Sequence, residues 1–216
     1  MDEPNLSQLL SASVNPADQA CAFFNKFLLP EAVGRVNSEF APARLWKLSR
    51  EREPLPVDTR QLSSYRTRMG TVLEYALSTA IQQSLRTRYG EELFLTFAVA
   101  HEYPDFYLRD RALNVILKIE MKAVDADSDE QAARFDVATS RIDPGRDMVI
   151  FVAWEWAGFH TADGGEGERP FIFAAFAAVA AEIAGERDRR LLANRGQNRR
   201  RAGHGSVDQD SRRHGP

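Results

Sequence analysis

The stretch LNVILKIEMK, residues 113–122, constrains the fold of this chain more than any other. Its odd-numbered positions are all apolar, whereas its even-numbered positions become polar and end with Lys118, Glu120 and Lys122. Because successive side chains of a β-strand point to opposite faces, this alternation predicts a strand with one face in the core. Glu120 and Lys122 then project from the same face, about 6.5–7 Å apart along the strand.

The segments around this strand predict a mixture of helices and strands. A helix is expected over 64–89, because apolar residues recur there every three or four positions and Gly90 follows as a stop. The runs ELFLTFAVAHEY and MVIFVAWEW read as strands, and a short helix is expected over 129–138. The segment from 171 reads as a short strand that passes into an alanine-rich helix. This order predicts an α/β fold with a central mixed sheet flanked by helices.

Length and composition fit one domain with shorter segments at its two ends. The 216 residues are 44% hydrophobic and 27% charged, which is ordinary for a globular protein. We expect a helical N-terminal region over 1–60, a core over 61–195 and a disordered, arginine-rich tail over 196–216. No apolar run approaches the roughly 20 residues of a membrane span, and no signal-peptide pattern is present. With Cys21 as the single cysteine, a cytoplasmic location is expected.

A further carboxylate, Asp105, stands where the preceding strand should end. Pro104 cannot donate to a strand ladder, so pairing is expected to loosen there. A hairpin that turned at 109–111 would place Asp105 opposite a position near 115, well short of Glu120. From spacing alone, whether the two carboxylates meet depends on where the turn lies.

Carboxylates beside a lysine are able to form a metal site. Oxygen donors without a cluster of His or Cys suit a hard divalent cation, Mg²⁺ before Zn²⁺. Such an ion lowers the pKa of water and neutralises charge at a phosphodiester, and a lysine stabilises the phosphate or orients the attacking water. The alternative is an ordinary ion pair of Glu120 and Lys122 on a half-buried strand. Similarly, Glu74 lies at the edge of its helix's apolar stripe and fits either an ordinary edge glutamate or a further site carboxylate.

The pair Pro104-Asp105, followed fifteen residues later by Glu120-x-Lys122, resembles the PD-(D/E)XK nuclease superfamily, which includes many restriction endonucleases. The resemblance covers about residues 65–156 and includes the order of helices and strands. It implies that Asp105 and Glu120 bind the metal, that Lys122 assists the water and the phosphate, and that the two motif strands form a hairpin that brings both acids to the ion.

Two further positions match additional features of this superfamily. Many members add a glutamate from a preceding helix, and Glu74 is in the matching place, as an accessory ligand or as support for one. Some branches have a glutamine in the helix after the lysine strand, for which Gln131 is the weak candidate.

The resemblance also implies an activity and partners. It implies a restriction endonuclease-like nuclease core over 61–195 that uses Mg²⁺ to hydrolyse double-stranded DNA, most simply as a type II restriction endonuclease that works as a homodimer. A repair or recombination nuclease on the same fold is an alternative. A non-catalytic DNA-binding protein is another, and the intact aspartate, glutamate and lysine count against it.

DNA contacts are expected from arginines near the site, because guanidinium groups suit phosphates and guanine edges. The candidates, each of which also fits a solvated surface arginine, are Arg60, Arg66, Arg68, Arg134, Arg141 and Arg146. Residues 185–216 carry nine arginines and four acids, a net charge of +5, so the remaining residues carry −3 − 5 = −8, and this acidic main domain counts slightly against a polyanionic partner. Trp154 and Trp156 favour core packing over base stacking, and the isolated His101 and His160 are assigned no role.

Overall fold

A computed structural model describes residues 10, 15–39, 46–98, 103–127, 141–160, 164–187 and 189. The helix expected over 129–138, with Gln131 and Arg134, lies outside the described residues. The same holds for His101 and for the tail expected over 196–216.

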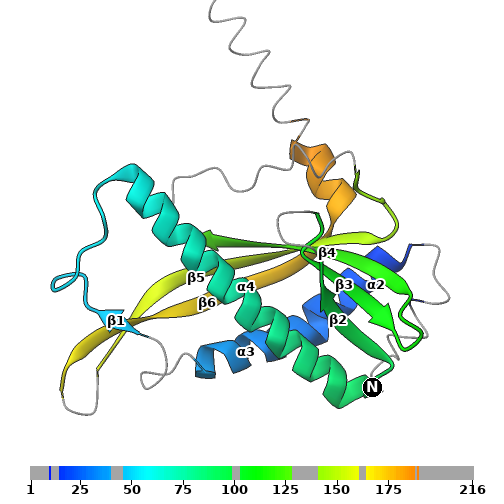
Figure 1. Ribbon diagram of the computed structural model, residues 1–216, viewed down its shortest axis with the longest axis horizontal. Coiled ribbons are helices and arrows are strands. Elements are labelled where there is room, and N and C mark those ends of the chain that lie inside the picture. The colour runs from blue at the N-terminus through cyan, green and yellow to red at the C-terminus, as the bar shows by residue number, and fades with distance from the viewer. Residues whose placement is uncertain are drawn as a thin grey trace, which may run out of the picture.

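A six-stranded mixed sheet forms the centre of the fold (Figure 1). Its strands, in chain order, are β1 (Lys47–Leu48), β2 (Leu93–Phe97), β3 (Phe106–Asp110), β4 (Val115–Asp125), β5 (Asp147–His160) and β6 (Glu166–Val179). They lie side by side in the order β1-β6-β5-β4-β3-β2, and β4 and β5 run parallel while the other neighbours are antiparallel. Helices pack on this sheet, which confirms the expected α/β class with a mixed central sheet.

Strand β6 is longer than its sequence suggests. It continues through the alanine-rich run FAAFAAV to Val179, and helical residues begin only at Ala180. The expectation of a short strand with an early helix is therefore wrong. The physical reason is pairing, because β6 is matched to β5 from Glu166 to Val179. Such tertiary pairing outweighs a helical preference of alanine that amounts to less than about 1 kcal/mol per residue.

Three consecutive helical segments cover the edge of β6 that the short β1 leaves open: α2 (Pro16–Phe23), the π-helical η1 (Phe24–Leu28) and α3 (Leu29–Glu39). Asn25 Nδ2 donates to Ala177 O at 2.8 Å, and Asn25 Oδ1 accepts from Ala177 N at 2.7 Å. Asn37 makes the same pair of bonds with Ile172, at 2.8 and 2.9 Å. The two asparagines satisfy backbone groups that a neighbouring strand would otherwise pair. The expected N-terminal helices are confirmed within 16–39.

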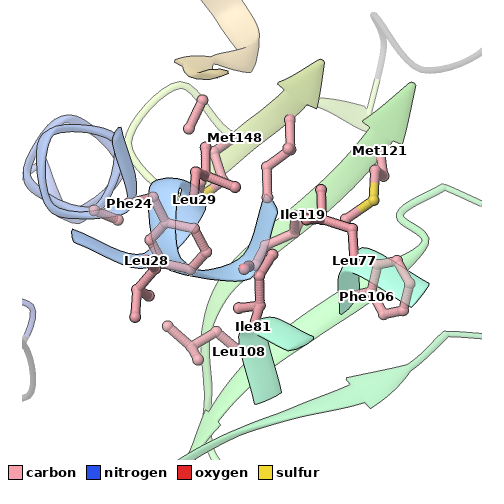
Figure 2. Packing of buried hydrophobic residues seen from close by; sticks show 14 of the residues in the cluster. Phe24, Leu28, Leu29, Leu77, Ile81, Phe106, Leu108, Ile119, Met121 and Met148 are labelled. Atoms are coloured by element: carbon pink, nitrogen blue, oxygen red, sulfur yellow. The ribbon is translucent and has the colours of Figure 1, made fainter. Parts of the chain in front are cut away.

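The long helix α4 (Thr59–Tyr89) runs diagonally across the sheet (Figure 1) and contacts β2, β4 and α3. It begins five residues before the expected start, because Asp58 Oδ1 accepts a hydrogen bond from Gln61 N at 2.9 Å and caps the first turn. It ends at the expected Gly90, whose positive φ of 61° suits glycine. Figure 2 shows how Leu77 and Ile81 of this helix pack over the sheet, beside the labelled residues Phe106, Leu108, Ile119 and Met121.

The alternation that predicts β4 is confirmed from residue 115 onward. Leu117, Ile119 and Met121 are buried in the core, and Glu120 and Lys122 belong to the opposite face. Leu113 differs from the prediction, because it lies in the turn before the strand, with a φ of 69°, and is exposed. The turn is closed by Asp110, whose carboxylate accepts hydrogen bonds from the backbone N and side-chain Nδ2 of Asn114.

Candidate functional site

The candidate site lies where β4 runs on beyond the beginning of β3. The last matched pair of these two strands is Phe106 with Ile119, so among the described residues no strand pairs with that side of β4 from Glu120 to its end at Asp125. Two carboxylates occupy the open edge instead. Asp105 Oδ2 accepts a hydrogen bond from Met121 N at 2.8 Å, and Glu74 Oε1 accepts one from Ala123 N at 3.1 Å. This edge of β4 therefore holds one carboxylate from the residue just before β3 and one from α4.

The register of the hairpin places Asp105 level with Glu120. Asp105 directly precedes Phe106, whose partner Ile119 directly precedes Glu120. The hairpin turns at residues 111–114, later than the expected 109–111, and a bulge between Leu108 and Arg109 shifts the register further. Asp105 was expected to end the preceding strand, but that strand, β2, ends at Phe97, and Asp105 directly precedes the separate strand β3. The turn position that the sequence left open brings the two carboxylates together.

Glu120 is the most buried charged group of the site, with 8% of its surface exposed. Its Oε1 lies 2.5 Å from Lys122 Nζ. Its Oε2 is buried and has no hydrogen-bond partner among the residues that the structure describes. An unsatisfied buried carboxylate oxygen is costly, typically by about 1–3 kcal/mol or more, so it marks a place where a ligand would be favourable.

The pKa values of Glu74, Glu120 and Lys122 are shifted by burial and by neighbouring charges. Burial, together with the charges of Asp105 and Glu120, raises the pKa of Glu74 to about 7, although the Ala123 N–H and Lys122 oppose the shift. Burial likewise raises the pKa of Glu120, against the opposing hydrogen bond and charge of Lys122. Burial alone would lower the pKa of Lys122, but the hydrogen bond and charge of Glu120 outweigh it and raise that pKa. Such shifts are typical of charged groups gathered in a functional site.

The donor set fits a hard divalent cation. Asp105, Glu120 and Glu74 supply only oxygen atoms, and with all three ionised beside one lysine the cluster carries a net charge of about −2. The side chains are not yet arranged around a common point, because no group of three or more His, Cys, Asp or Glu among the described residues has the geometry of a metal centre. The unsatisfied Oε2 of Glu120 is the atom that a cation would satisfy.

A second polar cluster lies next to Glu120 and was not predicted from the sequence. Asp147, at the start of β5, is fully buried, and its Oδ2 accepts hydrogen bonds from Tyr103 Oη at 2.7 Å and Asp143 N at 2.8 Å. Lys118 Nζ lies 3.6 Å from the same oxygen. Lys118 was visible on the polar face of the predicted strand, but its partner comes from a distant part of the chain. This cluster fixes Tyr103 one residue before the Pro104-Asp105 pair.

The described arginines that were expected to contact DNA differ in whether they are bonded within the fold or exposed to solvent. Arg66 is occupied within the fold, since its Nε donates to Asp125 Oδ2 at 3.1 Å and its Nη2 to Asp127 O at 2.8 Å. The exposed candidates are Arg60, Arg68, Arg141 and Arg146. Trp154 is buried and Trp156 is partly buried against the core, which confirms core packing for this pair.

The chain was compared with known proteins in three ways. No family model, no curated protein and no solved structure matches it. Within the described ranges, no helix has the length and apolar character needed to cross a bilayer.

Proposed function

We propose that this chain is a Mg²⁺-dependent endonuclease that hydrolyses the phosphodiester bonds of double-stranded DNA. The observation that carries the proposal is the buried, unsatisfied Oε2 of Glu120, which lies among two further carboxylates and one lysine. The proposed metal ligands are Asp105, Glu120 and Glu74. Lys122 is the proposed phosphate-binding group.

Each residue has a role that follows from its surroundings. A bound Mg²⁺ would supply an activated water and neutralise developing charge on the phosphate. Asp105 and Glu74 are each held by a backbone N–H of β4, which limits their movement and presents their remaining oxygens to a ligand. Because Glu120 raises its pKa, Lys122 stays protonated in the neutral range. Lys122 is therefore suited to donate to a phosphate oxygen and unsuited to act as a general base.

The order of elements also supports the proposal. Helix α4 is followed by the antiparallel strands β2, β3 and β4, and β5 returns parallel to β4. The resemblance implies a helix with a glutamate, two strands with the acidic pair, a helix and a further strand. Helix α4, the β3–β4 hairpin and β5 follow this order, β2 is an additional strand, and the implied second helix lies outside the described residues.

The charge of α4 supports a polyanionic partner in spite of the acidic chain. Glu74 is the one acid in the 31 residues of this helix, which contain five arginines. Arg66 and Arg88 are paired with acids of other elements, and Glu74 faces the site. The exposed side of α4 therefore presents Arg60, Arg68 and Arg86 and no carboxylate of its own. A local cationic surface of this kind attracts nucleic acid at short range even when the net charge is negative.

Plasmid cleavage tests the proposal directly. Wild type is incubated with plasmid DNA and Mg²⁺, beside an EDTA reaction and the variants Asp105→Asn and Glu120→Gln. Glu155→Gln is a matched control, because Glu155 is an exposed glutamate on the neighbouring strand β5. Loss of a metal ligand should slow cutting by about 100-fold or more, since several kcal/mol of transition-state stabilisation are removed. Undiminished cutting by Glu120→Gln would refute the site.

The pattern of products separates the two nuclease alternatives. Discrete fragments that recur in every digest indicate a sequence-specific type II restriction endonuclease, which we expect to act as a homodimer. Cutting that follows DNA structure, with no recurrent fragments, indicates a repair or recombination nuclease. The third alternative is a non-catalytic DNA-binding protein, in which the contact between Lys122 and Glu120 is a structural ion pair. In that case Mg²⁺ would neither support cleavage nor bind.

A further inference from the structure

Two exposed aromatic rings are stacked at the border between α4 and the edge strand β2. The rings of Tyr75 and Phe97 lie 5.9 Å apart with an interplanar angle of 13°, and Phe97 contacts Phe106 at 5.0 Å. Phe106 is buried, but Tyr75 is 60% exposed and Phe97 is 63% exposed. We call Tyr75 and Phe97 the aromatic pair. Large exposed apolar surfaces at one spot usually mark a binding site.

The aromatic pair is connected directly to the candidate site. Tyr75 follows Glu74 in α4, and Phe106, on which Phe97 rests, follows Asp105 in the chain. The end of β2 is also tied to the site, because Ala98 N donates to Asp105 O at 2.9 Å. Two of the three proposed metal ligands are therefore adjacent in sequence to residues that form or support the aromatic pair.

Cationic side chains flank Tyr75 on the outer side of α4. Arg68 and Arg86 stand seven residues before and eleven residues after it, which places all three within about 20° of one line along the helix. Both arginines are exposed, and the structure records no ion pair for either among the described residues. The line thus reads cation, aromatic ring, cation, with spacings of about 10 and 16 Å.

A small cavity opens beside Phe97. Its volume is about 120 Å³, and its walls combine apolar and polar groups, including Leu95, Phe97, Thr79 and Gln82. Thr79 Oγ1 donates to Tyr75 O and Gln82 Oε1 accepts from Leu95 N, so the cavity offers mainly apolar surface, which suits the face of a planar ring.

We propose that the aromatic pair binds an unpaired nucleotide base of the DNA strand that is cut at the neighbouring carboxylates. The proposal rests on the proposed nuclease function. Aromatic rings that stack on bases, combined with cations that follow the backbone, are the recurrent means of holding single-stranded nucleic acid. In an intact duplex both faces of a base are covered by its neighbours, so only a base that is unpaired or turned out of the helix meets Tyr75 or Phe97. The substrate class is accordingly DNA with an unstacked base near the scissile phosphate.

A second copy of the chain is the competing occupant of this surface. In a symmetric contact the same patch faces itself, so Arg68 and Arg86 would approach the partner's cationic side chains without an acid from α4 to balance them. Charge therefore favours a polyanion over self-association at this place.

The test measures binding to fluorescein-labelled oligonucleotides in EDTA, where no cleavage interferes. Tyr75→Ala and Phe97→Ala are compared with Phe173→Ala, a control at an aromatic residue on β6 that is 51% exposed. We expect the first two variants to bind single-stranded DNA about 5- to 100-fold more weakly than wild type, as for the loss of one base stack. Binding to blunt duplex should change less than about twofold, and Tyr75→Trp should restore single-strand affinity. Equal losses for single strand and duplex would overturn the proposal.

An abasic nucleotide moved along the strand sharpens the test. At the contacted position the abasic nucleotide should weaken DNA binding by wild type. It should not change DNA binding by Tyr75→Ala, because that variant already lacks the ring on which the base would stack. If no position shows this dependence, the aromatic pair does not bind a base. If base dependence is found but no DNA is cut with Mg²⁺, base binding stands and the nuclease function fails. If light scattering shows that the variants convert a dimer to a monomer without changing base dependence, the surface is a contact between copies and the proposal is overturned.

Discussion

Replacing Glu74 by glutamine should stabilise the metal-free protein at alkaline pH. The Glu74 carboxyl is largely buried, and burial together with the nearby Asp105 and Glu120 raises its pKa from 4.5 to about 7. Its hydrogen bond from Ala123 N can be kept by glutamine, whose amide oxygen has the same place in the side chain. The substitution therefore removes the charge and leaves most of the packing in place.

The magnitude follows from the linkage between protonation and folding. Below about pH 4.5 the carboxyl is protonated in both folded and unfolded chains, and its burial carries no charge penalty. Between about pH 4.5 and 7 the unfolded chain loses this proton while the folded chain keeps it, so stability falls with pH and levels off once the folded carboxyl ionises. The total loss is roughly 3 kcal/mol as an upper bound, because each pH unit of that interval costs about 1.4 kcal/mol. Partial solvent access of Glu74 lowers the expected gain to about 1–3 kcal/mol at pH 8.5.

Urea denaturation in EDTA at pH 5 and pH 8.5 measures this effect. Glu74→Gln should exceed wild type in unfolding free energy at pH 8.5, by more than at pH 5, with an unchanged dependence on urea. With Mg²⁺ the wild type should recover, because a bound cation favours the ionised carboxyl, whereas the variant should respond less. Glu155→Gln, at an exposed position, serves as the control. A difference between wild type and Glu74→Gln that is the same at both pH values would refute the reasoning.

Three further predictions concern groups outside the carboxylate cluster. Tyr103→Phe removes a donor from the fully buried Asp147 and should lower the unfolding free energy by about 1–3 kcal/mol in urea denaturation. Asn37→Ala removes both hydrogen bonds to the Ile172 backbone and should cost about 1–3 kcal/mol, measured in the same way. Cys21 is buried, and burial raises the pKa of its thiol to about 12, so a thiol reagent at pH 8 should modify it only as fast as the chain unfolds.

The sequence predicts those parts of the fold that depend on local periodicity. Alternation identified β4 and the shared face of Glu120 and Lys122, because a buried strand face demands apolar residues at every second position. The same reasoning fails for β6, where alanine offers no clear period and favours helix weakly. The hydrogen bonds and packing that β5 provides decide its structure, and these depend on residues that are distant in sequence.

The site shows a similar division. The spacing of Asp105 and Glu120 could not show whether they meet, because that depends on one bulge and on the turn that Asp110 and Asn114 close. A shift of one residue in the pairing of β3 with β4 would have moved Asp105 away from Glu120 and onto the opposite face of the sheet. The link from Tyr103 to Asp147 spans 44 positions and leaves no periodic signal at all. Such contacts are determined by the packing of the whole sheet.

The net charge of a chain says little about any one part of its surface, for a physical reason. A charge acts strongly only within about 8–10 Å at physiological salt, so a ligand responds to the nearby surface and not to the total. In this chain several acids form ion pairs within the fold, such as Asp125 with Arg66 and Glu168 with Lys47. On α4, Arg66 and Arg88 are paired with Asp125 and Glu31, whereas Arg60, Arg68 and Arg86 are exposed. In the proposed complex these three arginines and the proposed metal ion would both attract an anionic strand, although the chain as a whole carries a charge of −3.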